Sequence, residues 1–343
     1  MARRPTLQDL ARSADVGTAT VDRALNGRGN VSKRSIAAIA EAAKRIGYPL
    51  PASASGMVAA AKPKLDLGFV LHKPSQPFYR HFAQKITEAC AETSEADITP
   101  HLSFSPSQAP DDFAKAILEA ASKGQAVAAT AINHPSLSRL VDRLAADGIP
   151  VFPLLNDFAG RTSAGYFGLD NMKVGRLAGW MMATQLQRPC RVAVMVGGTR
   201  WHGQGLRETG FRAALREHAP QIMVTDTSVN LETRQVTYEA TLDLLQRHAD
   251  LAGIYVAGGG MEGAIAALRE ARPSGKVALI VNELTDESRA ALADRYATMV
   301  IATPLSKLSR ALIKTMVTCA VQPKTPTPRH AVFEPLIYLP ESV

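Results

Sequence analysis

The sequence has few of the residues that stabilise small secreted proteins or bind structural metals. Its 343 residues include only three cysteines, Cys90, Cys190 and Cys319, and their wide spacing fits neither a disulfide framework nor a metal motif. It has no apolar run of about 18 residues, so no membrane-spanning helix is predicted. These absences exclude a disulfide-rich scaffold, a zinc module and an integral membrane protein, and they favour a reducing cytoplasm.

Motifs of catalysis are scarce as well. Gly197-Gly198 and Gly258-Gly259-Gly260 lack the spacing of dinucleotide-binding or P-loop fingerprints, and no nucleophile elbow or paired-carboxylate motif occurs. The N-terminus is basic and then polar, without the apolar core of a secretory signal. We therefore predict no enzyme, no cofactor and no metal, and we expect a cytoplasmic protein.

Positive charge is concentrated near the N-terminus. Residues 1–64 hold 11 Lys and Arg against 4 Asp and Glu, whereas residues 65–343 hold 28 against 27. Because phosphates attract such surplus charge, the first segment is predicted to contact nucleic acid. A basic tail without a fold is the alternative, but the alanine and isoleucine pattern of this segment is too regular for disorder.

This N-terminal segment has the signals of three short helices. Thr6 can cap the first helix with Asp9 as its capping-box partner, and a second helix is predicted over residues 18–25. Ser32 can cap a third helix that ends at Gly47. A short turn joins the first two helices, so the pattern is that of a helix-turn-helix with a supporting third helix.

The segment resembles the LacI family of bacterial transcription regulators. The resemblance covers the whole N-terminal domain, for which we predict residues 1–48, and it implies that the second helix enters the major groove of operator DNA. The shared signature is Thr6-Leu7-x-Asp9-Leu10-Ala11, then Val16-Gly17-x-x-Thr20-Val21-x-Arg23-x-Leu25-Asn26, then Val31-Ser32.

The resemblance also implies which side chains contact DNA. An arginine offers a bidentate fork to guanine, and short side chains offer apolar contact to a thymine methyl group. Hydroxyl and amide side chains donate to phosphates and so position the domain. Base contacts are expected from Thr18, Ala19 and Arg23, and phosphate contacts from Thr6, Thr20, Asn26 and Ser32.

Three positions depart from the family pattern. Asp15 stands where the family usually has Gly, and Asp tolerates the left-handed conformation that the turn requires. Gly17 stands where the family usually has Ser, and so does Asp22. Asp22 either orients Arg23 or accepts a hydrogen bond from a cytosine amino group; the alternative is a solvated helix residue without a role in DNA binding.

Residues 49–64 are predicted to be a linker, because they are rich in Pro, Ala, Ser and Lys. In the LacI family such a linker folds into a short helix on DNA and inserts an apolar side chain into the minor groove. The resemblance assigns that role to Met57. Pro51 and Gly56 weaken helix propensity, so a flexible tether is the alternative.

From residue 65 to residue 343, short apolar runs alternate with longer amphipathic stretches. Such alternation predicts parallel sheets covered by helices, and the units are too many for one sheet, so we expect an α/β body of two lobes. The predicted strands cover residues 67–71, 98–104, 126–132, 150–155, 191–196, 222–229, 253–256, 277–281 and 298–302, and the predicted helices cover 79–93, 111–122, 136–147, 171–186, 205–218, 232–248, 261–271 and 304–319.

We expect the chain to cross between the lobes. Lobe 1 is predicted to comprise about 65–166 and 297–325, and lobe 2 about 167–296 and 326–343. Because ligands of parallel sheets bind at the carboxyl ends of the strands, two facing lobes would enclose a ligand in a cleft.

The body resembles the periplasmic sugar-binding proteins, a fold that the LacI family uses as its sensor. Anchors include Gly68-Phe69-Val70, Gly168-Leu169-Asp170-Asn171 and Arg207-x-x-Gly210-Phe211. The resemblance implies a sugar or sugar-like effector, since aromatic faces suit sugar C–H groups and polar side chains suit hydroxyls. The implied ligand-binding residues are Gln76, Phe78, Tyr79, Asp157, Arg207 and Glu283.

Some of these assignments have structural alternatives. Phe78 and Tyr79 could be core residues, and Arg207 could form a surface ion pair. Trp201 and His202 are further candidates for the cleft, whereas Asp170-Asn171 is interpreted as a crossover and helix cap. Gly258-Gly259-Gly260 replaces the Asn or Asp of many sugar binders; it either admits a bulkier or anionic ligand or is simply a turn.

The sequence therefore predicts a DNA-binding repressor, controlled by a sugar, polyol or derivative bound between the lobes. The resemblance implies a homodimer on a palindromic operator, and no heptad helix follows residue 320 to suggest a coiled-coil tetramer. The alternative is a soluble α/β sugar-binding or sugar-phosphate-processing protein without sequence-specific regulation.

Overall fold

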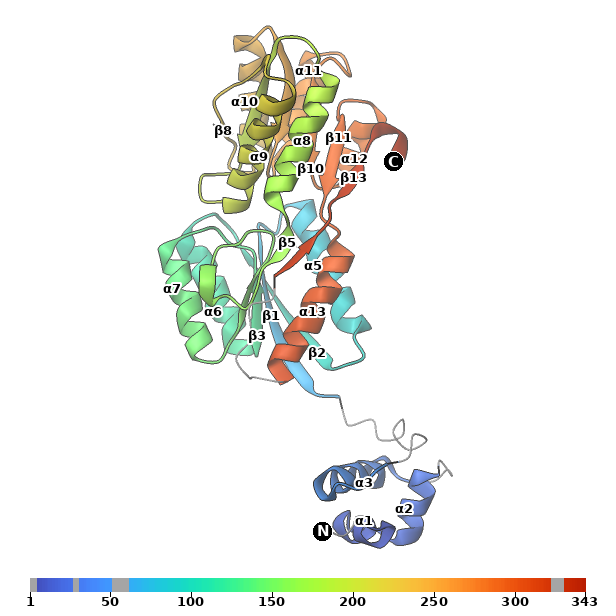
Figure 1. Ribbon diagram of the computed structural model, residues 1–343. Helices are drawn as coiled ribbons and strands as arrows, with labels where there is room; N and C mark the ends of the chain where they lie inside the picture. The colour runs from blue at the N-terminus through green and yellow to red at the C-terminus, as the bar shows by residue number, and fades with distance from the viewer. Residues whose placement is uncertain (1–4, 27–30, 51–61, 322–329) are drawn as a thin grey trace. The chain divides into compact units, whose positions relative to one another are not determined.

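The computed structural model describes residues 5–26, 31–50, 62–321 and 330–343. The described chain forms two compact units, one of residues up to Lys64 together with Ser94–Asp97, and one of Leu65–Thr93 together with Ile98–Val343. The first holds the N-terminal helices and the second the α/β body (Figure 1). Met57 and most of the predicted linker 49–64 lie outside the described residues, so the minor-groove wedge stays a prediction.

The N-terminal unit consists of α1 (Leu7–Ser13), α2 (Thr18–Leu25) and α3 (Lys33–Ile46). Local capping sets the helix ends. Thr6 and Asp9 form a reciprocal capping box, in which the Asp9 amide donates to Thr6 Oγ1 over 3.3 Å and the Thr6 amide donates to Asp9 Oδ2 over 2.9 Å. Asp15 adopts the left-handed conformation with φ 52° in the turn before α2.

The other end of the unit follows the same local rules. Ser32 Oγ accepts the Ser35 amide over 3.1 Å at the start of α3, and Gly47 ends the helix with φ 67°. The three helices then share one small apolar core, to which every helix contributes. Its buried members are Leu10, Ala11, Ala14, Val21, Ala24, Leu25, Ile39, Ala42 and Ala43.

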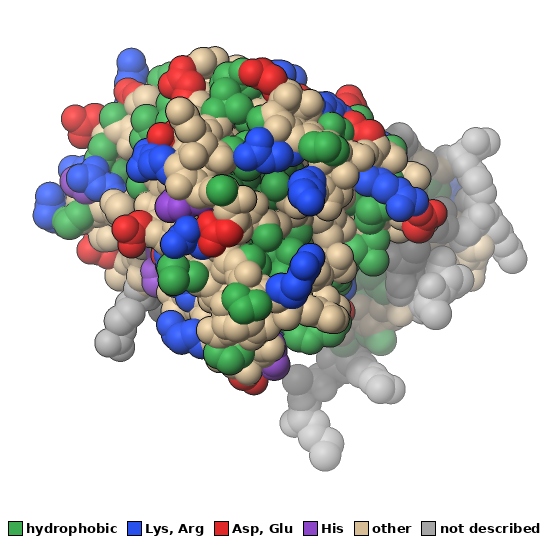
Figure 2. Space-filling view, turned by 90° about the horizontal axis from the view of Figure 1, so that it is seen from above, with side chains coloured by type: hydrophobic (Ala, Val, Ile, Leu, Met, Phe, Trp, Pro, Cys, Tyr) green, Lys and Arg blue, Asp and Glu red, His purple; other side chains and the backbone are tan. Residues whose placement is uncertain are grey.

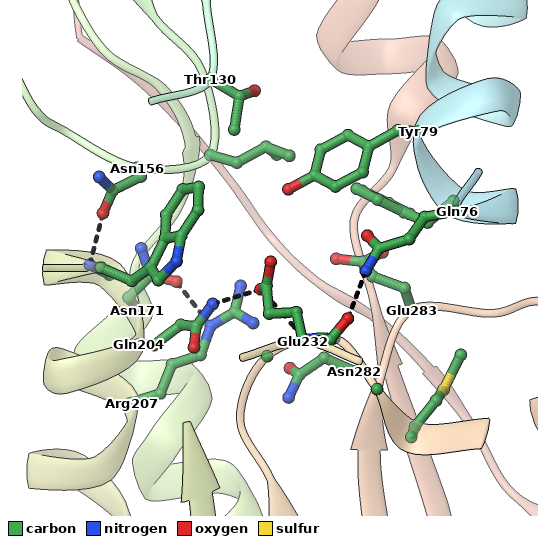
Figure 3. Close-up of a pocket in the computed structure, with 18 of the residues that line it drawn as sticks. Gln76, Tyr79, Thr130, Asn156, Asn171, Gln204, Arg207, Glu232, Asn282 and Glu283 are labelled. Atoms are coloured by element: carbon green, nitrogen blue, oxygen red, sulfur yellow. Dashed lines mark hydrogen bonds between the residues drawn. The ribbon is translucent and has the colours of Figure 1, made fainter. Parts of the chain in front are cut away.

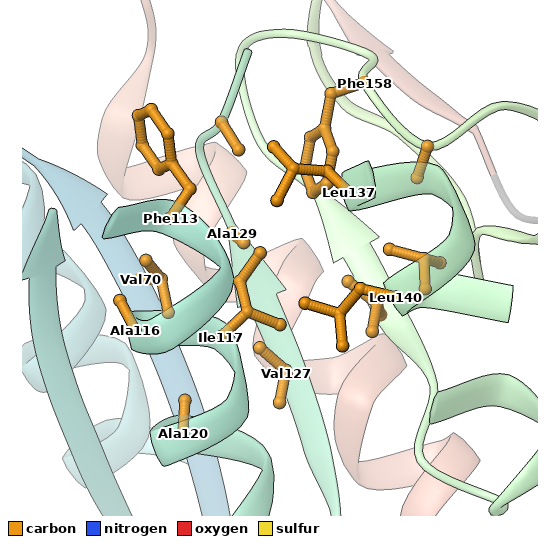
Figure 4. Packing of buried hydrophobic residues seen from close by; sticks show 14 of the residues in the cluster. Val70, Phe113, Ala116, Ile117, Ala120, Val127, Ala129, Leu137, Leu140 and Phe158 are labelled. Atoms are coloured by element: carbon orange, nitrogen blue, oxygen red, sulfur yellow. The ribbon is translucent and has the colours of Figure 1, made fainter. Parts of the chain in front are cut away.

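Lobe 1 of the body is built on a four-stranded sheet with the order β2-β1-β3-β4. The helices α6 and α7 pack on this sheet through buried apolar side chains, among them Phe113, Ile117, Leu137 and Leu140 (Figure 4). In chain order the elements are β1 (Lys64–His72), α5 (Pro77–Glu92), β2 (Asp97–Ser105), α6 (Pro110–Lys123), β3 (Ala126–Ala129), α7 (Pro135–Ala146), β4 (Val151–Pro153) and η1 (Gly160–Thr162).

Lobe 2 contains a larger sheet with the order β13-β11-β10-β9-β6-β7, and β8 also pairs with β6. The strand pairings of this sheet are parallel except that of β13 with β11. Its elements are α8 (Asn171–Gln185), β6 (Cys190–Val196), α9 (His202–His218), β7 (Ile222–Val224), β8 (Ser228–Val229), α10 (Arg234–Arg247), β9 (Leu251–Val256), α11 (Met261–Ala271), β10 (Ala278–Asn282), α12 (Asp286–Ala293), β11 (Met299–Ala302), β13 (Leu336–Tyr338) and η2 (Pro340–Ser342).

The crossovers between the lobes differ from the predicted positions. The sequence predicts that lobe 1 resumes at about residue 297, but β11 pairs with β10 of lobe 2, so the chain returns only after Thr303. Conversely, β5 (Phe167–Leu169), expected to open lobe 2, is bridged through Phe167 to Leu154 of lobe 1. Hydrophobicity identifies a buried strand, but it does not say which sheet the strand joins.

The last part of the body ties the lobes together. Helix α13 (Leu305–Val321) packs against α5 and β3 of lobe 1, and β12 (Ala331–Phe333) pairs in parallel with β5 before β13 joins lobe 2.

Within the described ranges, no helix combines the length and the apolar character needed to cross a bilayer. One face of the molecule shows basic and acidic side chains interspersed (Figure 2), as the near-balanced charge of residues 65–343 leads one to expect.

Candidate DNA interface and ligand cleft

Helix α2 presents a continuous exposed stripe on the face opposite the domain core. Val21, Ala24 and Leu25 are buried, and since successive helical residues turn by about 100°, the side chains on the other side share one solvent-facing arc. Five of the predicted DNA-contacting residues lie on this arc, namely Thr18, Ala19, Asp22, Arg23 and Asn26. The helix is therefore able to present an arginine, a carboxylate and short side chains to a groove.

Hydrogen bonds along this stripe bear on one of the roles considered for Asp22, the orientation of Arg23, and leave its contact with cytosine a prediction. The Asn26 amide Nδ2 donates to Asp22 Oδ1 over 2.8 Å, whereas the Arg23 Nε donates to the Ala19 carbonyl over 3.1 Å. Asp22 thus orients Asn26 and not Arg23. The Arg23 Nε is used within the helix, which leaves the Nη nitrogens to form the fork that a guanine requires.

Two of the predicted phosphate-contacting hydroxyls have local partners. Thr6 Oγ1 donates to Asp9 Oδ2 over 2.7 Å, and Ser32 Oγ lies 2.9 Å from Ser35 Oγ. Thr6 and Ser32 are both exposed and cap α1 and α3, while Thr20 lies within α2 and is partly exposed. The contact of these three hydroxyls with phosphate stays a prediction.

In the body, a cavity of about 80 Å³ lies between the lobes at the carboxyl ends of their strands. One water needs about 10–15 Å³ of such space, so the cavity has room for a small ligand. Its lining comprises Gln76, Pro77, Phe78, Tyr79, Thr130, Leu155, Asn156, Asn171, Trp201, Gly203, Gln204, Arg207, Glu232, Gly258, Gly259, Gly260, Met261, Glu262, Asn282 and Glu283.

Arg207 reaches this cavity because α8 and α9 pack backbone to backbone. A Cβ at Gly175 would lie 1.9 Å from the Arg207 carbonyl oxygen, and a Cβ at Gly210 would lie 2.2 Å from the Met172 carbonyl oxygen. Only glycine permits this approach. Arg207 is 8% exposed, and its Nε donates to Asn171 Oδ1 over 2.7 Å while Nη1 donates to the Ala257 carbonyl over 2.9 Å.

Glu283 is held at the end of β10 in the left-handed conformation, with φ 73°. Its two carboxylate oxygens accept the Thr303 hydroxyl over 2.7 Å and the Thr303 amide over 2.9 Å. Burial raises the pKa of Glu283, and the bonds from Thr303 and the charge of Arg207 oppose that rise. The carboxylate is thereby fixed at the point where the chain leaves lobe 2.

Glu232 is a cavity residue that the sequence reasoning missed. It is 6% exposed and lies in the loop between β8 and α10, where both Leu231 and Glu232 have positive φ values of 53° and 52°. Its Oε1 accepts Gln204 Nε2 over 2.7 Å and the Gly259 amide over 3.2 Å, as Figure 3 shows for Gln204. The sequence predicts Glu232 as the first residue of a helix over 232–248, whereas α10 begins only at Arg234.

The same loop contacts lobe 1. Lys73 Nζ donates to the Leu231 carbonyl over 2.7 Å, and Gln76 Nε2 donates to the Glu232 carbonyl over 2.8 Å. Both donors follow the carboxyl end of β1. Lobe 1 side chains therefore hold the main chain of a lobe 2 loop across the cleft.

Trp201 makes the second contact between the lobes. It precedes α9 of lobe 2, yet it is 3% exposed within the apolar core of lobe 1, where its ring centroid lies 5.5 Å from that of His72 and 6.2 Å from that of Phe113. The first turn of α9 is tied to lobe 1 by the Gly203 amide, which donates to Asn156 Oδ1 over 2.8 Å. The lobes are thus closed on each other in this structure.

Four buried polar atoms in the cavity lining have no hydrogen-bond partner among the described residues. They are Thr130 Oγ1, Trp201 Nε1, Glu232 Oε2 and Asn282 Oδ1. Buried polar groups without partners are costly, so groups of this kind mark a place where a ligand supplies the missing bonds.

The structure brings together five of the six predicted ligand-binding residues. Gln76, Phe78, Tyr79, Arg207 and Glu283 all line the cavity. Asp157 is not in the lining, and its neighbour Asn156 takes that place, because Leu155 has a positive φ of 61° and changes which side chain faces the cleft.

Two further interpretations from the sequence need correction. The sequence indicates Asn171 only as part of a crossover and cap, but this residue lines the cavity, while Asp170 is the N-cap of α8. Of the adjacent candidates Trp201 and His202, only Trp201 is in the lining.

Comparison with known proteins finds two matching domain families. Residues 67–322 match the periplasmic binding protein domain. Residues 6–49 match the bacterial regulatory proteins of the lacI family. The chain is also 23% identical over 266 residues to the HTH-type transcriptional regulator GalS of Salmonella typhimurium, an alignment that covers 77% of this chain and 75% of that protein.

Solved structures of sugar-binding proteins share the fold of the body. GanP, a glucose-galactose binding protein from Geobacillus stearothermophilus, superposes with a TM-score of 0.74 at 17% identity, covering 82% of this chain and 99% of that one. A solute-binding protein from Bacillus halodurans with bound myo-inositol gives a TM-score of 0.72 at 16% identity, covering 82% and 97%. At these identities the likeness establishes the fold.

Proposed function

Because this chain belongs to the periplasmic binding protein domain family and carries a lacI-family DNA-binding domain, we propose that it is a transcriptional repressor controlled by a sugar or polyol. The chain is a regulator and not an enzyme. In this proposal it binds a palindromic operator as a homodimer in the cytoplasm, and its ligand occupies the cavity between the lobes.

The observation that carries the proposal is the pairing of two sites in one chain. Arg23 stands on the exposed stripe of α2, where DNA can reach it. Arg207 stands in a buried cavity with four polar atoms that have no partner among the described residues. A surface suited to a duplex and a cavity suited to a small polar molecule are what a ligand-controlled DNA switch requires.

The sugar assignment is supported by the lining and by the fold. Tyr79 and Phe78 lie with their ring centroids 5.1 Å apart at the start of α5 and offer apolar faces, and Arg207, Asn282 and Glu283 offer polar groups. Proteins of this fold have been solved with a sugar or with myo-inositol bound. Such a lining suits a ring with hydroxyl groups around its edge.

Control of DNA binding by the ligand requires unequal affinity for two lobe arrangements. The loops around Trp201 and Glu232 bridge the lobes, and the cavity lies between them. A ligand that bonds to both lobes favours the closed arrangement. The difference in its binding free energy between the closed and open arrangements is then the largest change in DNA affinity that it can cause.

The proposal is tested with the full-length protein on palindromic and random duplexes, at several salt concentrations and with a panel of sugars and polyols. We expect a steep loss of affinity with salt on both duplexes, a preference for particular sequences, and at least one sugar that changes this preference. Equal affinity for every duplex, unaffected by any compound, would refute the repressor assignment.

Variants separate the sensor from the DNA-binding domain. Arg207→Ala should weaken the ligand response, because the cavity loses its one lining arginine and the bonds that hold Asn171 and the Ala257 carbonyl, while DNA affinity without ligand stays the same. Arg216→Ala, at an exposed position of the same helix, is the matched control. The dimer is tested by sedimentation of the full-length protein, for which a monomer at all concentrations would be the contrary result.

A further inference from the structure

The cavity collects acidic side chains. Among its charged lining residues, Glu232, Glu262 and Glu283 face a single cation, Arg207. Within the described residues, no salt bridge joins any of the three carboxylates to a lysine or an arginine. Burial raises the pKa of Glu262 most, and the charges of Glu287 and Glu232 also raise it, while its backbone hydrogen bond and the charge of Arg234 lower it. Three carboxylates therefore share the lining with one arginine, and the cations Arg234 and Lys73 lie outside the lining.

Glu232 carries a vacant acceptor. Its Oε1 is bonded to Gln204 and to the Gly259 amide, but Oε2 has no hydrogen-bond partner among the described residues, and the titratable group beside it is His72, with Nε2 at 3.7 Å. Burial, and next the charge of Lys73, lower the pKa of His72 to about 3, so this imidazole is neutral. A neutral imidazole keeps one N–H, but at 3.7 Å it is too far from Oε2 for a hydrogen bond, so Oε2 is left for a donor from within the cavity.

A second acceptor lies on the same wall. Asn282 Nδ2 donates to the Val256 carbonyl over 2.8 Å, which fixes the amide orientation, and Asn282 Oδ1 has no partner in the described part of the chain. Figure 3 shows Asn282 and Glu232 on neighbouring parts of the cavity wall. A ligand that satisfies these two oxygens must present hydrogen-bond donors to them.

The glycines at 258–260 do not form an anion site. The Gly259 amide is already donated to Glu232 Oε1, and a Cβ at Gly258 would lie 2.4 Å from Gln204 Oε1, so the loop is packed and not open. Gly260 is the N-cap of α11, and Glu262 stands in the first turn. A helix N-terminus is a natural place for a phosphate, but here the acidic Glu262 in the first turn of α11 would repel one. The sequence-based alternative of an anionic ligand is disfavoured.

We propose that this cavity selects polyhydroxylated ligands without negative charge and rejects their phosphate esters, and that Glu232 determines this selectivity through its free carboxylate oxygen. A ligand hydroxyl donates to Glu232 Oε2 and another to Asn282 Oδ1. A phosphate in the same place would meet like charges in a poorly hydrated site, where Coulomb repulsion is strong. The inference rests on the proposed function, in which this cavity holds the effector.

The test measures binding of matched compounds to the full-length protein by calorimetry and by thermal shift. Neutral sugars and polyols, D-galactose and myo-inositol among them, are each paired with their monophosphate, and D-galactosamine supplies a cationic member. We expect at least one neutral compound to bind and its monophosphate to bind about tenfold or more weakly. A monophosphate that binds more tightly than its parent, or a panel without a neutral binder, would overturn the inference.

Glu232→Gln isolates the charge while keeping an oxygen for Gln204 and Gly259. We expect this variant to bind the neutral compound less tightly and to lose about tenfold of the discrimination against the monophosphate. Glu239→Gln, an exposed position on α10 that is outside the lining, is the matched control with the same change in net charge. Unchanged discrimination in Glu232→Gln would contradict the role of this residue.

A second variant keeps the test decisive if Glu232→Gln does not fold. Glu262→Gln changes the other carboxylate beside the α11 N-terminus and should likewise narrow the discrimination between the neutral compound and its phosphate. Failure of the inference is distinct from failure of the proposed function. In the first case a phosphate ester binds and alters DNA affinity; in the second, sequence-preferring DNA binding is itself lacking.

Discussion

The N-terminal domain and the body place their functional side chains in opposite environments. The domain presents Arg23 and its neighbours on an exposed helix face, supported by a core of nine buried residues. The body buries Arg207 and Glu232 between two lobes. Function on a surface depends on one helix being folded, whereas function in a cleft depends on loops from distant segments meeting. This contrast predicts different responses to the same kind of damage.

Removal of a buried core side chain should have the largest effect on stability, and the effect should differ most between the N-terminal domain and the body. Leu10→Ala removes a fully buried side chain, at a cost of about 2–5 kcal/mol, from a domain too small to absorb such a loss. We expect the domain to unfold and DNA binding to disappear, while ligand binding by the body is retained.

The matched control is Leu140→Ala in lobe 1, where the leucine is 2% exposed. It should lower the melting temperature of the body without unfolding it at room temperature, since a larger core tolerates a similar loss. Circular dichroism and DNA binding measure both. If the two variants lost DNA binding alike, the two regions would not be energetically separate.

A surface change in the domain should affect recognition and leave stability unchanged. Arg23→Ala should cost about 1–3 kcal/mol of affinity for the specific operator and far less for random DNA. The side chain is exposed and makes one bond along its own helix, so little stability is lost. Titration of both duplexes checks this, and equal losses on both would rule out a base contact.

A lower pH should reduce the free energy of unfolding of the body through His72, an effect that the N-terminal domain lacks. His72 is fully buried with a pKa of about 3, whereas the unfolded chain takes up the proton near the ordinary histidine pKa of 6.5, and residues 1–64 contain no histidine. Between these values the unfolded state binds more protons, so stability falls as the pH is lowered below 6.5. The expected loss from this group is about 1.4 kcal/mol per pH unit.

Urea unfolding of the body at neutral pH and about one and a half units lower measures this slope. His72→Gln should reduce it, while His81→Gln, at an exposed position of α5, should leave it as it is. An unaltered slope in His72→Gln would assign the acid sensitivity to other groups.

The smallest predicted effect has opposite signs in the two regions. Gly47 has φ 67°, and a Cβ added there would meet no neighbouring atom, so Gly47→Ala should destabilise the N-terminal domain by about 1 kcal/mol through backbone strain alone. Gly205 lies inside α9 with equally open space, and Gly205→Ala should stabilise the body by about 0.5–1 kcal/mol. Thermal unfolding of each variant measures the change in stability. If the φ angle had no influence, both substitutions would change the stability in the same direction.

The same contrast explains what could be predicted from the sequence. The bounds of α2 and the caps Thr6, Ser32 and Gly47 match the prediction because each signal acts within a few residues. In the body, the alternation predicts most strands and helices, but β5 and α12 are missed, and residues 222–229 divide into β7 and β8. Short elements and sheet membership depend on packing partners far away in the sequence.

The residues of the cleft show most clearly what the sequence does not predict. Arg207 and Glu283 can be placed from the family resemblance and from their positions at a helix start and a strand end. The sequence favours Asp157 over Asn156 because the left-handed turn at Leu155 has no sequence signal in a non-glycine residue. Glu232 escapes prediction because two consecutive strained residues turn its side chain inward, and only the fold supplies the contacts that hold them there.

The position of Trp201 provides an intrinsic optical probe of this protein. The chain has two tryptophans, and Trp180 is 50% exposed while Trp201 is inserted into the apolar core of the opposite lobe. Separation of the lobes must withdraw that indole into water and shift its emission to longer wavelength. Trp180→Phe would remove the fluorescence of the exposed tryptophan. The emission wavelength of Trp201 would then report the opening and closing of the lobes in real time.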